Sequence, residues 1–106
     1  MAQNVTSYKD VQAKLTQPWV HVALGQVDDY CVYLCRFEGT YRFHQHSRDE
    51  MYLVLEGEIV IEFRGGPILV LRQGDSLVVK AGELHRSAAT ESALVLMFKA
   101  RDLFAE

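Results

Sequence analysis

Cysteine, proline and long apolar segments are scarce in this chain, and each absence excludes a class of protein. Two cysteines among 106 residues are too few for the disulfide framework of a small secreted domain. Even the apolar run Ala93–Phe98 is far too short to cross a bilayer. The first residues lack the basic start and the apolar stretch of a secretory signal. We therefore expect a cytoplasmic protein with no membrane partner.

Basic charge is also scarce, and it is scattered along the chain. The sequence has 11 lysines and arginines against 14 aspartates and glutamates, which gives a formal net charge of -3. A nucleic-acid-binding protein usually gathers basic residues into a stripe that neutralises phosphates, and no such run is present. We therefore expect no nucleic-acid partner. With two prolines and no candidate linker, residues 1–106 are expected to form a single domain.

The N-terminal part of the chain has the periodicity of a helix. Thr6 or Ser7 can cap it, and Tyr8, Val11 and Leu15 then fall on one face. A proline three residues after Leu15 prevents the helix from continuing. The sequence predicts a short helix at about residues 6–16, followed by strands over about residues 19–100.

After the proline the pattern changes to short runs rich in β-branched, leucine and aromatic residues, separated by glycine and aspartate turns. Several strands at this spacing predict an all-β sandwich or barrel. Strands that are apolar on both faces need cover on the outside as well, which suggests a second subunit. The predicted strands are Trp19–Leu24, Tyr30–Phe37, Met51–Leu55, Glu58–Phe63, Ile68–Leu71, Ser76–Val79 and Leu94–Phe98.

Metal-binding residue types gather in one short stretch. His44 and His46 are two apart, so on an extended segment they project to the same face. Glu50 follows after a short bend and supplies a carboxylate. Further along, Gly74 and Gly82 bracket a strand, and His85 opens the next one; if the two segments lie side by side, His85 completes the site. Imidazole and carboxylate donors suit zinc, iron, manganese or nickel.

These two stretches resemble the two motifs of the cupin superfamily. The first motif is matched by Gly39, His44, His46, Glu50 and Gly57, and the second by Gly74, Gly82 and His85. The chain departs from the family pattern at Lys80 and Ala89, where proline and asparagine are usual. The resemblance implies a cupin-type double-stranded β-helix, or jelly-roll barrel, with a short N-terminal helix. It also implies one divalent metal ion bound by His44, His46, Glu50 and His85, and a homodimer.

The sequence leaves two classes of function open. One is a metal-dependent enzyme, of dioxygenase or isomerase type, that acts on a small oxygen-rich molecule. The other is a non-catalytic module that binds or senses such a molecule, since one fold hosts many functions. No acid–base pair is evident outside the four proposed ligands, so no catalytic residue is assigned.

Four further residues have structural interpretations. Cys31 and Cys35 would lie about 13 Å apart on one strand, too far for a disulfide, and are expected to be buried and reduced. His21 has no partner at ligand spacing and is interpreted as an ordinary strand histidine. Tyr52, two residues after Glu50, is expected to pack in the core, with a contact to the site as the alternative.

Overall fold

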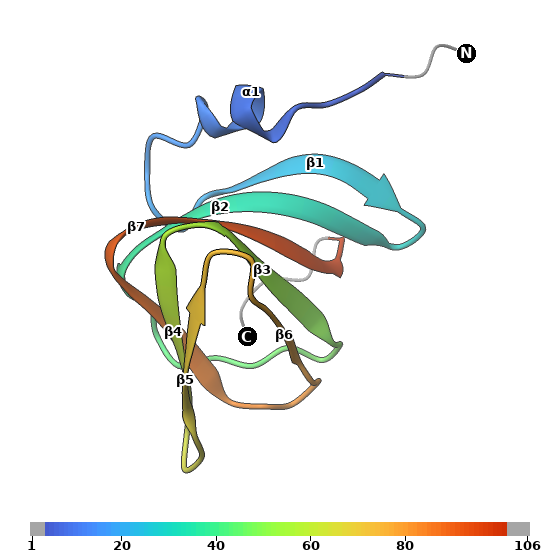
Figure 1. Cartoon of the computed structure of the whole chain (residues 1–106). Coiled ribbons are helices and arrows are strands. Elements are labelled where there is room, and N and C mark those ends of the chain that lie inside the picture. Colours follow the sequence, from blue (N-terminus) through green and yellow to red (C-terminus); the bar gives the residue numbers. More distant parts are fainter. Residues whose placement is uncertain (1–3, 102–106) are drawn as a thin grey trace.

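The computed structural model describes residues 4–101 and contains one short helix followed by seven strands (Figure 1). The predicted all-β barrel with a short N-terminal helix is confirmed. The elements are α1 (Tyr8–Gln12), β1 (His21–Val27), β2 (Tyr30–Thr40), β3 (Glu50–Glu56), β4 (Glu58–Phe63), β5 (Ile68–Arg72), β6 (Ser76–Val79) and β7 (His85–Ala100).

The seven strands form one antiparallel sheet, which curls into the barrel around the long strand β7. Its second half lies between β2 and β3, which gives the strand order β1-β2-β7-β3-β6. Its first half pairs with β4, and β4 pairs with β5. Because β7 pairs with β4 near its beginning and with β2 and β3 toward its end, it connects the two sides of the barrel (Figure 1).

The barrel interior is built from alternate residues of each strand. On β4, Ile59 and Ile61 are fully buried and the preceding Glu58 is exposed, as the sequence pattern predicts. On β2, Cys31 and Cys35 both face inward and are buried and unpaired, so that prediction is confirmed. Their thiols act as small apolar groups in the core.

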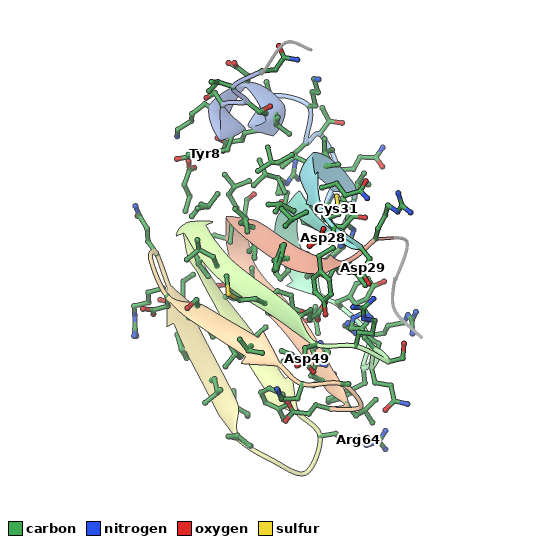
Figure 2. All side chains as sticks on the ribbon, turned by 90° about the vertical axis from the view of Figure 1, so that its right-hand side faces the viewer. Tyr8, Asp28, Asp29, Cys31, Asp49 and Arg64 are labelled. Atoms are coloured by element: carbon green, nitrogen blue, oxygen red, sulfur yellow. The ribbon has the colours of Figure 1, made fainter. Side chains whose placement is uncertain are left out.

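The helix α1 covers part of the outer face of the large sheet. Val11 of the helix and Leu15 just after it pack against Leu34 of β2 and Leu94 of β7, and all four are buried. Figure 2 shows α1, with Tyr8, at one end of the molecule. The helix thus covers part of the apolar outer surface, for which the sequence analysis suggested cover by a second subunit.

Two of the element boundaries that differ from the predictions have a local cause. The helix ends at Gln12, earlier than predicted, because single turns replace helical hydrogen bonds as the chain approaches Pro18. Strand β1 begins at His21 because Trp19 has a φ of +69°, which no strand residue adopts. No helix within residues 4–101 is long and apolar enough to cross a membrane.

Candidate metal centre

The two histidine-bearing segments meet through the backbone. The N–H of His44 donates to the carbonyl of His85 at 2.9 Å, and the N–H of His85 donates to the carbonyl of His44 at 3.0 Å. The N–H of Gly82 also donates to the carbonyl of His46, at 2.9 Å. Directly opposed residues of an antiparallel pair place their side chains on the same side. The segment before β3 therefore delivers its histidines beside the first residue of β7.

The loop that precedes Glu50 is fixed at its far end by Asp49. The Asp49 carboxylate accepts hydrogen bonds from the N–H of Ala81 at 2.9 Å and from Nζ of Lys80 at 3.0 Å. The hydroxyl of Tyr30 donates to the Asp49 carbonyl at 2.9 Å. These contacts tie the loop to the turn after β6 and to β2, so Glu50 starts β3 in a fixed position, with its side chain inside.

The structure brings together all four residues that the sequence selected. One ligand atom from each of His44, His46, Glu50 and His85 lies within 4.8 Å of the others, and all four residues are buried. Oε1 of Glu50 lies 3.4 Å from Nε2 of His46 and 3.3 Å from Nε2 of His85. Ligand atoms that share an ion at about 2.1 Å are separated by about 3.0–4.2 Å. The two distances from Oε1 of Glu50 fall in this range, and the 4.8 Å limit of the whole group lies slightly above it.

Hydrogen bonds to backbone carbonyls determine the tautomers of His44 and His85. Nδ1 of His44 lies 2.9 Å from the carbonyl oxygen of Arg42, and Nδ1 of His85 lies 2.8 Å from that of Glu83. A carbonyl oxygen can only accept, so each Nδ1 carries the hydrogen and each Nε2 keeps its lone pair. Such a partner for the second ring nitrogen is typical of metal-binding histidines.

Tyr52 contacts the group directly. Its hydroxyl donates to Oε1 of Glu50 at 2.6 Å and lies 3.2 Å from Nε2 of His85. Tyr52 is fully buried in the core, as expected, and the alternative of a contact with the site also holds. The other oxygen of Glu50, Oε2, is buried without a hydrogen-bond partner among residues 4–101. A buried carboxylate oxygen without a hydrogen-bond partner is typical of a site that takes up a water molecule or an ion.

Burial and nearby polar groups shift the pKa values of His44 and Glu50. Burial lowers the pKa of His44 to about 4. For Glu50, burial alone raises the pKa, but the nearby His46 and His85 imidazoles and the hydrogen bond from Tyr52 outweigh it and hold the pKa below its usual range. At neutral pH the group therefore offers a neutral His44 imidazole and a charged carboxylate. A metal ion requires these forms, because it cannot bind a protonated donor.

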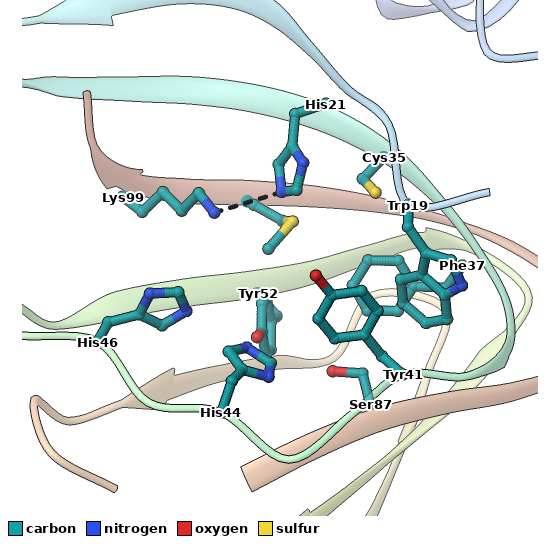
Figure 3. A pocket seen from close by; sticks show the side chains of 11 residues that line it. Trp19, His21, Cys35, Phe37, Tyr41, His44, His46, Tyr52, Ser87 and Lys99 are labelled. Atoms are coloured by element: carbon teal, nitrogen blue, oxygen red, sulfur yellow. Dashed lines mark hydrogen bonds between the residues drawn. The ribbon is translucent and has the colours of Figure 1, made fainter. Parts of the chain in front are cut away.

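A cavity of about 140 Å³ lies beside His44 and His46 (Figure 3). His44, His46 and Tyr52 form part of its wall. Another part is aromatic: the ring of Trp19 lies 4.7 Å from that of Phe37 and 5.0 Å from that of Tyr41, centroid to centroid. The remaining wall comes from His21, Cys35, Ser87, Met97 and Lys99.

Two basic residues of this wall, His21 and Lys99, are absent from the predicted site. His21 does not join the metal-binding group, but its ring lines the cavity. Lys99 is 2% exposed and continues the inward-facing series that includes Val95 and Met97. The predicted strand ended at Phe98, one residue too early to include it. Extending the alternation by one step would have placed this lysine inside the barrel.

Comparisons with known proteins agree with this architecture. Residues 36–99 match Cupin_2, a cupin domain family. The uncharacterized protein YdbB of Bacillus subtilis (strain 168) is 41% identical over 66 residues, which cover 61% of this chain and 58% of YdbB. The chain thus spans less than two thirds of the length of this curated relative.

Solved structures show the same fold. A cupin-2 domain protein from Shewanella frigidimarina NCIMB 400 superposes with a TM-score of 0.87 at 28% identity, covering 92% of this chain and 95% of that one. Hydroquinone 1,2-dioxygenase PnpCD, in complex with Cd2+ and 4-hydroxybenzonitrile, gives a TM-score of 0.76 at 21% identity, with coverages of 86% and 69%. With its barrel and a family match over more than half of its length, the chain belongs to the Cupin_2 family of cupin domains.

Proposed function

We propose that the chain binds one divalent transition-metal ion, zinc, iron, manganese or nickel, through His44, His46, Glu50 and His85. The observation that carries this proposal is Oε2 of Glu50, a buried oxygen without a hydrogen-bond partner among the described residues, within a group of imidazoles. Burying a charge without compensation is strongly unfavourable, and a cation beside Oε2 removes that cost.

We propose further that the site acts on a small oxygen-rich molecule, as a metal-dependent enzyme of dioxygenase or isomerase type. A bound divalent ion supplies Lewis acidity to a coordinated oxygen. The chain itself supplies the enclosure: the cavity reaches His44 and His46, and its aromatic wall excludes water from a molecule seated there. The dioxygenase PnpCD has a related fold, which makes this chemistry a reasonable first assay.

The second candidate is a non-catalytic binding or sensing module. Within residues 4–101, no acid–base pair faces the cavity except the proposed ligands and the contacting pair of Lys99 and His21. This absence favours a binding module. Turnover separates the two candidates. A ligand that is consumed by the wild type but not by Glu50→Ala identifies an enzyme, whereas a ligand recovered unchanged with each of the four metals identifies a binding module.

Metal analysis of protein purified without an affinity tag tests the metal centre. We expect about one equivalent of divalent metal in the wild type and none in the double variant His44→Ala/His46→Ala. Gln45→Ala is the matched control, because Gln45 lies between the two histidines and is exposed. Stoichiometric metal in the double variant, with circular dichroism like that of the wild type, would refute the assignment.

We also propose that the protein is a homodimer. Large apolar side chains remain exposed on strands at the sheet edges: Ile68 and Val70 on β5 are 65% and 45% exposed, and Val78 on β6 is 50% exposed. Among the described strands, β5 pairs only with β4, and β6 only with β3. An open apolar edge is a site where another chain can pair.

A further inference from the structure

Three rings from separate parts of the chain form the aromatic wall of the cavity. Trp19 precedes β1, Phe37 lies on β2, and Tyr41 follows β2. The ring planes of Phe37 and Tyr41 are tilted by 40° and 42° from that of Trp19, at the centroid distances of 4.7 and 5.0 Å given above. Figure 3 shows these three rings together at one end of the cavity and His46 at the other. The cavity thus has an aromatic end and an imidazole end.

Trp19 holds its place in the wall in a disfavoured backbone conformation. Its φ of +69° lies in the left-handed region, which a large side chain rarely adopts. The N–H of Trp19 donates to the carbonyl of Arg36 at 2.8 Å, and Nη1 of Arg36 donates to the carbonyl of Thr16 at 3.2 Å. These bonds tie the segment before β1 to β2. Backbone conformations of this kind cluster at binding and catalytic sites, which indicates that the position of the indole serves a ligand as well as the fold.

Tyr41 connects the aromatic wall to the proposed metal ligands. Its ring lies edge-on to that of His44, with the centroids 5.2 Å apart, and the His44 centroid lies 5.0 Å from that of His46. Trp19, Tyr41 and the two histidines therefore form a continuous series of rings along the cavity. A molecule that rests on the aromatic wall has its other end beside the imidazoles.

The size of the cavity limits the ligand to a single ring. Its volume of about 140 Å³ is close to the roughly 150 Å³ that accommodates benzene in an engineered protein core. A planar ring against the aromatic wall can stack with an offset or pack edge to face, and both arrangements stabilise aromatic pairs. The thioether of Met97, also in the lining, is a favourable neighbour for a ring edge. These features favour an aromatic ring over a saturated one.

The lining also favours a ligand without charge on its ring. Burial raises the pKa of Cys35 to about 12, so this thiol of the cavity lining is neutral at pH 7. Cys35, Phe37 and Met97 together make an apolar surface, which disfavours a charged group. At the other end, a hydroxyl on the ring would lie beside His44 and His46, where the proposed ion supplies Lewis acidity to a coordinated oxygen.

We infer that Trp19, Phe37 and Tyr41 form a ring-binding subsite, and that its ligand is a phenol, a neutral monocyclic aromatic compound with a hydroxyl group. The ring lies against the aromatic wall, and the hydroxyl points toward His44 and His46. The hydroxyl contact rests on the proposed function, whereas the ring contact does not depend on the metal.

Isothermal titration calorimetry of the zinc-loaded full-length protein tests this subsite with phenol, cyclohexanol and toluene. Cyclohexanol keeps the ring size and the hydroxyl but has no aromatic face, and toluene keeps the face but has no hydroxyl. We expect phenol to bind about tenfold more tightly than cyclohexanol, because contacts between aromatic rings add to the burial of area. Trp19 is the single tryptophan of the chain, so its fluorescence should change as phenol binds.

Variants of Trp19 assign the preference to the aromatic wall. In Trp19→Leu the preference for phenol over cyclohexanol should fall about threefold or more, whereas lost packing alone would weaken both ligands alike. Trp19→Phe retains a ring and should keep most of the preference, even if Trp19→Leu folds poorly. Phe98→Leu is the matched control and should behave like the wild type: Phe98 and Tyr30 form a pair with the same 5.0 Å and 42°, but neither residue lines the cavity. Equal affinities for phenol and cyclohexanol in the wild type, or a preference that Trp19→Leu leaves unchanged, would overturn the subsite.

Zinc content and zinc removal, measured on the same samples, separate this inference from the proposed function. Removing zinc should lower the affinity for phenol relative to toluene by about tenfold, since the hydroxyl loses a charged partner, and should leave the preference over cyclohexanol in place. A ratio of phenol to toluene affinity that zinc does not change would overturn the assignment of the ligand as a phenol. Protein that holds zinc without preferring phenol to cyclohexanol refutes the ring-binding subsite and leaves the metal centre standing. Protein that holds no zinc, yet prefers phenol to cyclohexanol in a manner dependent on Trp19, supports the ring-binding subsite and refutes the metal centre.

Discussion

At the scale of single residues, the carboxylate of Glu50 depends on the hydroxyl of Tyr52. The two oxygens are 2.6 Å apart, and the same hydroxyl lies 3.2 Å from Nε2 of His85. The bond occupies Oε1 and leaves Oε2 available, so it orients the carboxylate as well as stabilising its charge. Hydrogen bonds to proposed metal ligands from neighbouring side chains usually have a large effect on metal affinity.

Tyr52→Phe should therefore weaken metal binding and leave the core packed. The variant keeps the ring and removes only the hydroxyl, so we expect zinc affinity to fall by about tenfold or more. The free energy of unfolding of the metal-free protein should fall by about 1–3 kcal/mol, because a buried charge loses its donor. Competition with a chelator and urea unfolding measure the two effects.

The control for this change is Tyr8→Phe, in which the hydroxyl removed belongs to α1 on the outer surface. Its zinc affinity should equal that of the wild type. Equal affinities in Tyr52→Phe and the wild type would mean that Glu50 is held in place by other contacts.

The buried histidines predict that the metal-free protein is sensitive to acid. Burial lowers the pKa of both His21 and His44 to about 4, whereas an unfolded histidine titrates near 6.5. Between these pH values the unfolded chain binds more protons than the native one. The free energy of unfolding should therefore decrease as the pH falls from about 6.5 to about 4, by up to about 1.4 kcal/mol per pH unit for each histidine. The depressed pKa of Glu50 acts in the same direction at still lower pH.

Urea unfolding of the metal-free protein at pH 7.0, 5.5 and 4.5 measures this dependence. In His21→Phe one of the two groups is gone, so the slope with pH should be smaller than in the wild type, whatever the variant's stability at pH 7. A wild-type stability that stays constant between pH 7 and pH 4.5 would be incompatible with neutral buried imidazoles.

At the scale of elements, the turn between β3 and β4 sits close to β7. Gly57 has a φ of +88°, and a Cβ on it would come within 3.1 Å of Cα and Cβ of Ala93. Positive φ excludes most side chains, and the backbone atom of Ala93 cannot move aside as a flexible side chain would. The turn between β3 and β4 approaches β7 this closely only because Gly57 has no side chain.

Gly57→Ala should therefore destabilise the protein more than the same change at another turn. Gly65 is the matched control: its φ is +73°, but a Cβ on it would meet no atom within 4 Å. We expect Gly65→Ala to cost about 1–2 kcal/mol from φ alone, and Gly57→Ala to cost more because of the added contact. Urea unfolding of both variants compares them, and equal losses would contradict the role assigned to Ala93.

Periodicity predicted most of the strands, and it failed where tertiary contacts determine the structure. Strand β4 begins and ends where alternation places it. Strand β7 starts nine residues before the predicted Leu94, because its first half is small and polar and is held by pairing with β4 and β2. The four proposed ligands came from motif spacing, which also predicted that they converge. Lys99 was missed because a lone lysine at the end of an apolar run resembles a surface residue.

At the scale of the whole molecule, the chain covers only part of its own apolar exterior. The helix α1 packs over one side of the large sheet, which accounts for the apolar outer residues Leu34 and Leu94. The strands at the sheet edges have no such cover in residues 4–101, and Ile68 on β5, at 65%, has the most exposed large apolar side chain of the described strands. Apolar patches of this kind usually mark an interface.

Sedimentation tests whether a second copy provides the remaining cover. We expect a mass of twice the 12.1 kDa chain at micromolar concentration. The double variant Ile68→Lys/Val70→Lys should sediment as a monomer, because both side chains lie on one face of β5 and lysines on a sheet edge repel a like-charged partner. Val27→Lys is the control, since Val27 is 55% exposed but lies at the end of β1.

A wild type that sediments as a monomer would exclude the dimer. A dimer that survives in the β5 variant but dissociates in Val27→Lys would place the interface on β1. If the dimer forms through β5, it leaves the metal centre intact, because His44, His46, Glu50 and His85 face the barrel interior and need no residue from the partner.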